Sequence, residues 1–304
     1  MKKQMNQYRK YLEKNIPKGI KEYYKTPSLQ RLMRIGYFCG MDYASPFIYN
    51  FKEYVSTYVH SITTAGITSL FSDDKKAILA ALFHDISKPV CSHVIDYMNK
   101  DYERQESTEA YTKDIILSDE LLVSLLKKDH IEPEEVIDFK RYSLVDLERP
   151  SLCADRIDGV LISSMIWSET LTLKEAKEIL KSLKLYINEY GVEEIGFDSF
   201  EKAKIFYEQN KIINSLVHSS WDTYMMQLLA DIVKLAIEEE LLTYESLYYL
   251  TDDMLFKLLD FSSNPILRNK LTEFETKLKT DIDYSNSSVK ERIINPLVKG
   301  KRLI

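Results

Sequence analysis

The stretch Ala80-Ala-Leu-Phe-His84-Asp85-Ile-Ser-Lys88-Pro89-Val-Cys-Ser-His93 decides the fold of this chain. Its first part is apolar on nearly every side, which is typical of a helix deep inside a helical bundle. The helix ends in an adjacent imidazole and carboxylate, His84 and Asp85, just before Pro89. A buried carboxylate needs a partner, because an unpaired charge in a low-dielectric interior costs several kcal/mol. A divalent metal would supply that partner, and a plain His–Asp hydrogen bond is the alternative.

The composition favours an all-α fold. The chain has 304 residues, 45% of them hydrophobic, with only 8 glycines and 8 prolines. Its 41 basic and 47 acidic residues are interspersed, so no basic excess indicates nucleic acid as a partner. The three cysteines show no CxxC spacing, which argues against a disulfide framework or a zinc–thiolate site. No signal peptide or membrane-spanning run is evident, so the expected location is the cytoplasm, with no membrane partner.

Two further helices carry candidate ligands. A helix predicted from Lys52 to Leu70 has an apolar row, and His60 lies one step beside it. From the residues alone, a lone histidine there is more often a core residue than a ligand. The helix after Pro150 holds Asp155 and Asp158 three residues apart on one apolar face, an unusual place for acids. A salt bridge is the alternative for these two carboxylates.

Terminal signals place the other helices. Thr26-Pro27 predicts a helix start, and Ser72-Asp73-Asp74 is expected to cap the central helix. Capping boxes are predicted at Thr172–Glu175 and Asp198–Glu201 within a C-terminal half that is predicted to be helical. Residues 288–304 add strand-like pieces with local positive charge. A single weak boundary lies near residues 168–172.

His60, His84, Asp85 and Asp155, taken in chain order, give the pattern His…His-Asp…Asp. This order resembles the ligand pattern of the HD superfamily of metal-dependent phosphohydrolases. The resemblance implies a helical HD-domain bundle with a mostly helical C-terminal extension and minor β pieces. It also implies a divalent metal, for which Mn, Fe, Mg, Co and Zn all suit two imidazoles and two carboxylates.

The resemblance extends to the deoxynucleoside triphosphate triphosphohydrolase-like branch and covers most of residues 20–304. The segments that carry it are Thr26-Pro-Ser-Leu-Gln-Arg-Leu, His84 to His93, Ala154-Asp-Arg-Ile-Asp158, Leu250-Thr-Asp-Asp-Met-Leu and Arg292-Ile-Ile-Asn-Pro-Leu. The branch implies a catalytic core at residues 20–168. It further implies a helical region at residues 169–304 that completes the fold and forms the interface of a homodimer or homotetramer.

Beyond the four ligands, the resemblance suggests roles for further side chains. Asp158 is expected to orient a ligand, since it shares a helix face with Asp155 three residues earlier. His93, Lys88 and Glu106 are the candidate catalytic residues, which would meet a phosphate or exchange a proton. The candidate substrate-binding residues are Tyr37, Thr57 and Arg156.

The chain departs from the branch at substrate-facing positions. The branch has a phosphate-binding arginine where Thr57 stands, and a catalytic histidine where Gln105 precedes Glu106. A glutamine cannot transfer protons at neutral pH. Tyr37 stands where the branch has a sugar-binding glutamine, and Gly159 and Ser163 replace a tyrosine and an aspartate that bind the sugar. The metal chemistry is independent of these changes, whereas the deoxynucleotide specificity depends on them.

The sequence therefore predicts a metal-dependent hydrolase of a nucleotide or another small phosphorylated compound. The branch-level reaction is release of tripolyphosphate from a deoxynucleoside triphosphate, while Thr57 and Gln105 favour a phosphomonoesterase. A metal- and nucleotide-binding regulatory module without turnover is a second hypothesis. A di-iron oxygenase ranks last, because only three histidines remain beyond the two ligands.

Overall fold

The computed structural model describes residues 4–103, 105, 107, 109–284 and 289–304. These residues are mostly helical with one small sheet, which confirms the predicted fold class. The helices are α1 (Gln4–Leu12), α2 (Pro27–Arg31), α3 (Thr57–Thr68), α4 (Lys75–Phe83), α5 (Val94–Met98), α6 (Thr112–Ser118), α7 (Glu120–Lys128), α8 (Glu134–Ile137), α9 (Ala154–Ile166), α10 (Leu173–Lys181), α11 (Phe200–Val217), α12 (Ser220–Glu238), α13 (Asp252–Asp260) and α14 (Pro265–Thr276). The strands are β1 (Leu183–Ile187), β2 (Glu193–Phe197), β3 (Leu297–Val298) and β4 (Lys301–Arg302).

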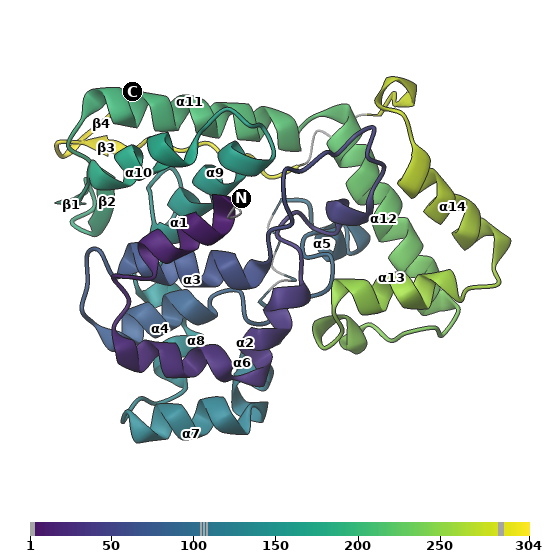
Figure 1. Cartoon of the computed structure of the whole chain (residues 1–304), viewed down its shortest axis with the longest axis horizontal. Coiled ribbons are helices and arrows are strands. Elements are labelled where there is room, and N and C mark those ends of the chain that lie inside the picture. Colours follow the sequence, from purple (N-terminus) through teal and green to yellow (C-terminus); the bar gives the residue numbers. More distant parts are fainter. Residues whose placement is uncertain (1–3, 104, 106, 108, 285–288) are drawn as a thin grey trace.

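Helix α3 is the centre of the N-terminal bundle. It packs against α4, α9 and α1, which lie around it in Figure 1. Every residue of α4 from Ala77 to Phe83 is buried, as the all-round apolar pattern predicted. Because α3 and α9 are also almost wholly buried, their polar side chains are enclosed at the place where the three helices meet.

Helix α1 sits on α3 at Gly66. A Cβ atom built at Gly66 would lie 2.8 Å from the Leu12 Cβ and 3.1 Å from the Leu12 backbone. We therefore expect Gly66→Ala to lower the free energy of unfolding by about 1–3 kcal/mol, as overpacking of a close contact does. Urea unfolding measures the change. Gly19→Ala is the matched control, because its new Cβ would meet only the Lys75 ammonium at 3.5 Å; equal loss in both variants would contradict the prediction.

Helix boundaries follow the predicted caps in part. Asp74 caps α4 by accepting from the backbone N–H of Lys76, and the Thr172–Glu175 capping box is present. The box predicted at Asp198 is wrong, because the Ser199 side chain caps α11 instead. The helix predicted from Lys52 begins at Thr57, since the preceding backbone hydrogen-bonds to residues 35–37 in extended form.

The small sheet joins two distant parts of the chain in the order β1-β2-β3-β4. The β1–β2 hairpin was missed by a prediction that made this region helical, whereas the strand-like pieces near the C-terminal end are present as β3 and β4. Phe197 of β2 pairs in parallel with Val298 of β3. Arg302 then forms two hydrogen bonds, 2.6 and 2.8 Å long, to the buried carboxylate of Glu194. These contacts fix residues 289–304 against the rest of the fold.

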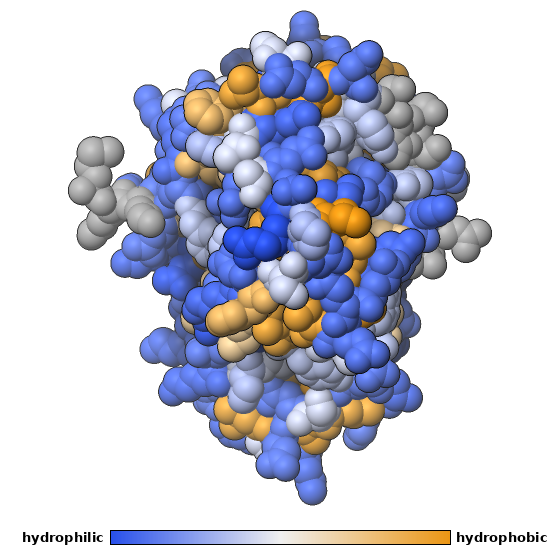
Figure 2. All heavy atoms as spheres, turned by 90° about the vertical axis from the view of Figure 1, so that its right-hand side faces the viewer, coloured by the Kyte–Doolittle hydropathy of each residue, from blue (hydrophilic) through white to orange (hydrophobic). Residues whose placement is uncertain are grey.

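The C-terminal helices pack beside the bundle. Helix α12 contacts α5 and α14, and α11 contacts α9 (Figure 1). The side formed by α13 and α14 is largely hydrophilic with scattered apolar patches (Figure 2). Among the described residues, no helix combines the length and apolar character that a membrane crossing requires. The domain division at residues 168–169, the homo-oligomer and its interface stay predictions.

Candidate metal centre

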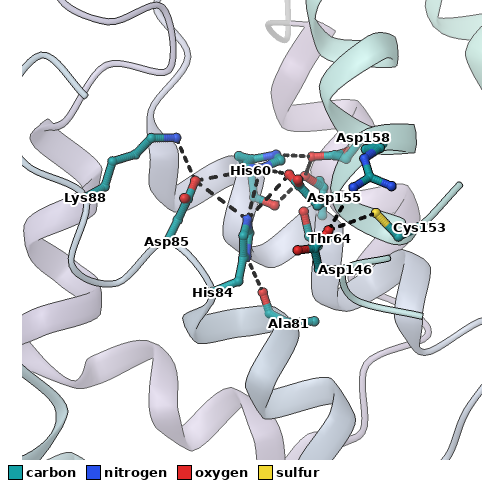
Figure 3. A network of polar contacts seen from close by, with 12 residues as sticks. His60, Thr64, Ala81, His84, Asp85, Lys88, Asp146, Cys153, Asp155 and Asp158 are labelled. Atoms are coloured by element: carbon teal, nitrogen blue, oxygen red, sulfur yellow. Dashed lines mark hydrogen bonds and ion pairs between the residues drawn. The ribbon is translucent and has the colours of Figure 1, made fainter. Parts of the chain in front are cut away.

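The bundle brings three of the four predicted ligands into one cluster. His60 lies in α3, His84 directly follows α4, and Asp155 lies in the first turn of α9. One ligand atom from each of these residues lies within 4.8 Å of the other two. Figure 3 shows their side chains converging from the three helices. Residues that are distant in sequence therefore share one centre because their helices pack together.

Hydrogen bonds fix the orientation of both imidazoles. His60 Nδ1 lies 2.8 Å from Asp158 Oδ2, and His84 Nδ1 lies 2.7 Å from the Ala81 carbonyl oxygen. Because each of these partners accepts, each Nδ1 carries a hydrogen, and in the neutral ring each Nε2 presents a lone pair. The two Nε2 atoms face each other at 3.2 Å. Two lone pairs so close repel unless a proton or a cation lies between them.

Asp85 lies beside the two imidazoles, on the side opposite Asp155 (Figure 3). Its Oδ2 lies 3.6 Å from His84 Nε2 and 3.8 Å from His60 Nε2, and it accepts a 2.7 Å hydrogen bond from Lys88 Nζ. Burial would raise the pKa of Asp85, but Lys88 and the two histidines outweigh it and hold the pKa well below its usual range. Asp85 is therefore an ionised carboxylate beside the two imidazoles.

Asp158 binds Nδ1 of His60, the ring nitrogen that does not face the other candidate ligands. It is fully buried and accepts hydrogen bonds from His60, from Tyr8 at 2.7 Å and from Thr63 at 2.5 Å. These three partners satisfy the carboxylate and fix the His60 ring, the arrangement that orients histidine ligands in metal sites. Tyr8 was missed by the sequence analysis, although its spacing of four residues from Leu12 places both on one face of α1.

The donor set fits a divalent metal. Two Nε2 atoms and two ionised carboxylates are borderline-to-hard ligands, suited to first-row metals and magnesium. The facing lone pairs of His60 and His84 are the feature of the geometry that a cation would relieve. We therefore expect His60, His84, Asp85 and Asp155 to hold the ion, with Asp158 orienting His60.

The pH dependence of metal affinity follows from the surroundings of His60. Burial lowers the pKa of His60, but hydrogen bonds to Asp155 and Asp158 outweigh it and raise the pKa from 6.5 to about 9. A metal must displace this proton, so Mn²⁺ affinity is expected to rise roughly tenfold per pH unit up to that value. In metal-free protein, protonated His60 stabilises the fold fully below pH 6.5, and this stabilisation is lost through about pH 9. Calorimetric Mn²⁺ titrations from pH 6.5 to 9 test this, and a flat affinity would contradict it.

The cluster opens into a cavity of about 340 Å³. Its wall includes five basic side chains from four parts of the chain: Lys88, Arg149, Arg156, Lys290 and Arg292. Burial, Arg292 and Arg156 together lower the pKa of Arg149 to about 10, and burial, Arg149 and Arg292 lower the pKa of Lys290. The cations thus repel one another, and an anion in the cavity would relieve that repulsion.

Of the three residues predicted to bind substrate, two are among the described residues that line the cavity. Tyr37 lines the cavity with its ring 4.9 Å from that of His60, and its hydroxyl would lie 2.9 Å from a Cβ at Gly159. Arg156 also lines the cavity and donates to Ser151 and Asp146. Thr57 does not belong to the described lining residues: it is fully buried where α3 begins, and its short side chain is enclosed there. The assignment of Thr57 to the substrate site stays a prediction.

Two of the predicted catalytic residues, Lys88 and His93, line the cavity, and Glu106 lies outside the described residues. His93 Nδ1 lies 2.8 Å from Oδ2 of the fully buried Asp96. Asp96 also accepts the backbone N–H of Ser107 at 3.1 Å. Because a carboxylate accepts at Nδ1, the Nε2 atom of His93 is the one left for proton exchange. Asp96 was not predicted from the sequence, although it follows His93 by three residues in a His-x-x-Asp pattern.

Arg292 enters the cavity from the C-terminal segment. Its guanidinium donates a 2.7 Å hydrogen bond to Gln105 Oε1. Its backbone N–H donates to Asn214 at 2.7 Å, and its carbonyl accepts from Asn210 at 2.8 Å. The two asparagines lie one turn apart on α11 and hold the segment in place. Arg149 and Arg292 were missed because no local motif connects them with the metal ligands.

Comparisons with known proteins agree with this centre. Residues 57–187, which contain all four candidate ligands, match the HD domain family. The uncharacterised protein YdhJ of Bacillus subtilis (strain 168) is 26% identical over 295 residues, covering 95% of this chain and 86% of that protein. The metal-dependent phosphohydrolase cns2 of Cordyceps militaris is 32% identical over 109 residues, covering 36% of this chain but only 30% of that protein. Residues 57–187 are therefore similar to the HD domain, and this similarity together with cns2 supports a metal-dependent phosphohydrolase.

Proposed function

We propose that this protein hydrolyses a phosphate ester of a nucleotide at the His60, His84, Asp85 and Asp155 centre. The observation that carries the proposal is that this cluster and five basic side chains line one cavity. A volume of about 340 Å³ lies within the range of small-molecule sites. When bound, a divalent ion supplies Lewis-acid chemistry and charge neutralisation at phosphorus.

The chain's own residues supply proton transfer. Burial lowers the pKa of His93, and Arg292 and Lys88 add to this effect while Asp96 opposes it. The imidazole is therefore neutral at neutral pH. Its Nε2 atom takes a proton from the attacking water and returns it to the leaving oxygen, while Asp96 keeps the ring in the required tautomer. Gln105 replaces the branch histidine as a proton-inert group that positions Arg292.

Arg292 is proposed to hold a phosphate oxygen. Arg292→Gln is expected to raise KM by about 10- to 100-fold with a smaller change in kcat, because one charge-assisted hydrogen bond is lost. Steady-state kinetics measure this, and bound metal is counted in the same samples. Arg268→Gln on exposed α14 is the matched control and should leave KM unchanged. Unchanged KM in Arg292→Gln would remove this residue from the substrate site.

Product identity tests the proposed function. The protein is purified with Mn²⁺ and incubated with deoxynucleoside triphosphates, ribonucleoside triphosphates and nucleoside monophosphates, and products are separated by chromatography. Tripolyphosphate plus nucleoside would support the branch-level reaction. Orthophosphate from monophosphates would support a phosphomonoesterase. Either product should be lost in Asp85→Ala. Metal binding without any product would contradict nucleotide hydrolysis and favour a binding module.

A further inference from the structure

One part of the cavity carries a buried carboxylate that the proposed hydrolysis does not use. Asp222 lies in the first turn of α12, is 7% exposed and lines the cavity. Tyr49 donates a 2.6 Å hydrogen bond to its Oδ1. Within the part of the chain that the structure describes, this is the side chain's only hydrogen bond, and no ion pair within 4 Å involves it. Burying a carboxylate that accepts a single hydrogen bond has a high cost in folding free energy.

Aromatic side chains surround this carboxylate. Phe38, Tyr49, Phe51 and Trp167 line the cavity and pack on one another. The rings of Phe38 and Phe51 stack with centroids 4.2 Å apart, and Trp167 lies 6.1 Å from Phe38 and 6.4 Å from Tyr49. We call these four rings together with Asp222 the aromatic chamber. Flat apolar walls with one acceptor are suited to a flat ligand that brings its own donor.

Arg292 does not satisfy Asp222. Burial raises the pKa of Asp222 to about 7, and Tyr49 and Arg292 offset it only in part. The Arg292 guanidinium is directed to Gln105 through a 2.7 Å hydrogen bond. Arg292 is therefore near enough to lower the pKa of Asp222, but its hydrogen bond goes to Gln105. This leaves the carboxylate available to a ligand in the cavity.

We propose that the aromatic chamber binds the organic half of the substrate as a flat nitrogen heterocycle whose exocyclic amino group donates to Asp222. The inference rests on the proposed function, since the basic wall would then hold the phosphate of the same molecule. Asp222 becomes a specificity-determining residue that favours amino-bearing bases over their oxo counterparts. Tyr49 occupies Oδ1, which leaves Oδ2 as the acceptor for this contact.

Nucleoside binding tests the chamber without requiring catalysis. Adenosine is compared with inosine, and cytidine with uridine, on the manganese-loaded full chain at a pH above 7, where Asp222 is mostly ionised. Dissociation constants are measured by ligand-observed NMR competition. The amino-bearing member of each pair is expected to bind about tenfold more tightly, the scale of one hydrogen bond to a charged group. Asp222→Asn should reduce this preference to less than about twofold, since the charge is lost. Glu238→Gln, at the exposed end of the same helix, is the matched control.

Tyr49→Phe separates recognition from a structural role. It removes only the hydroxyl, so it should lower thermal stability while the preference for amino-bearing nucleosides persists. Absence of nucleoside binding, equal binding within the pairs, or an unchanged preference in Asp222→Asn would each overturn the inference. Turnover is measured separately: a chain that prefers amino-bearing nucleosides but hydrolyses no nucleotide would contradict the proposed function alone. Nucleotide hydrolysis without this preference would contradict the chamber alone.

Discussion

Asp155→Ala is expected to abolish both metal binding and hydrolysis. The Asp155 carboxylate lies 3.0 Å from His60 Nε2 and 3.6 Å from His84 Nε2, so its removal leaves the two imidazoles without the acid that joins them. Burial would raise the pKa of Asp155, but hydrogen bonds to both histidines outweigh it and hold the pKa well below its ordinary value. The residue is thus an anionic ligand throughout the physiological pH range. Bound metal is counted by mass spectrometry after gel filtration.

Asp158→Ala is expected to reduce metal affinity less than Asp155→Ala does. Asp158 touches His60 rather than the ligand atoms, so its loss is expected to weaken metal affinity by about 10- to 100-fold. Asp114→Ala on exposed α6 should leave both metal content and activity unchanged. Circular dichroism establishes that each variant is folded. Full metal content in folded Asp155→Ala would refute the assignment of this carboxylate.

His93→Gln is expected to lower kcat by about 10²- to 10⁴-fold while metal content stays unchanged. The imidazole lines the cavity beside Lys88 and hydrogen-bonds to Asp96 rather than to a ligand of the metal. Because burial lowers the pKa of His93, activity should fall only as the pH drops below 6.5, where the imidazole gains a proton. The glutamine variant should lose that acid limb from its pH–rate profile.

The matched control for His93 is His130→Asn. His130 is exposed and lies in left-handed backbone with φ of 57°, a conformation that asparagine accepts more readily than most residues. This variant should keep the wild-type pH profile. Asp96→Asn should reduce kcat as well, since an amide no longer selects the same tautomer. A wild-type kcat in His93→Gln would exclude this residue from proton transfer.

The metal cluster was predictable because its residues stand out locally in the sequence. An apolar helix that ends in His84-Asp85 and an apolar helix that carries Asp155 and Asp158 both place charge where burial forbids it without a partner. Their meeting in one cluster follows from the packing of α3, α4 and α9. The helical fold class followed from composition in the same way.

The cavity wall was not predictable from local pattern. Arg292 lies in a segment without regular structure, and its place depends on Asn210, Asn214 and Gln105, which are ordinary polar residues in sequence. Thr57, predicted to contact substrate from its place in the resemblance, is fully buried at the start of α3, and its role stays a prediction. The β1–β2 hairpin was missed although its pairing is local, because the whole C-terminal half was predicted to be helical.

The anchoring of residues 289–294 on α11 has a consequence for synthesis on the ribosome. The candidate metal ligands are translated before the segment that carries Arg292. A chain that ends after α14 would keep these ligands while lacking the arginine that is proposed to hold phosphate. We therefore expect such a chain to lose turnover although it retains every candidate metal ligand.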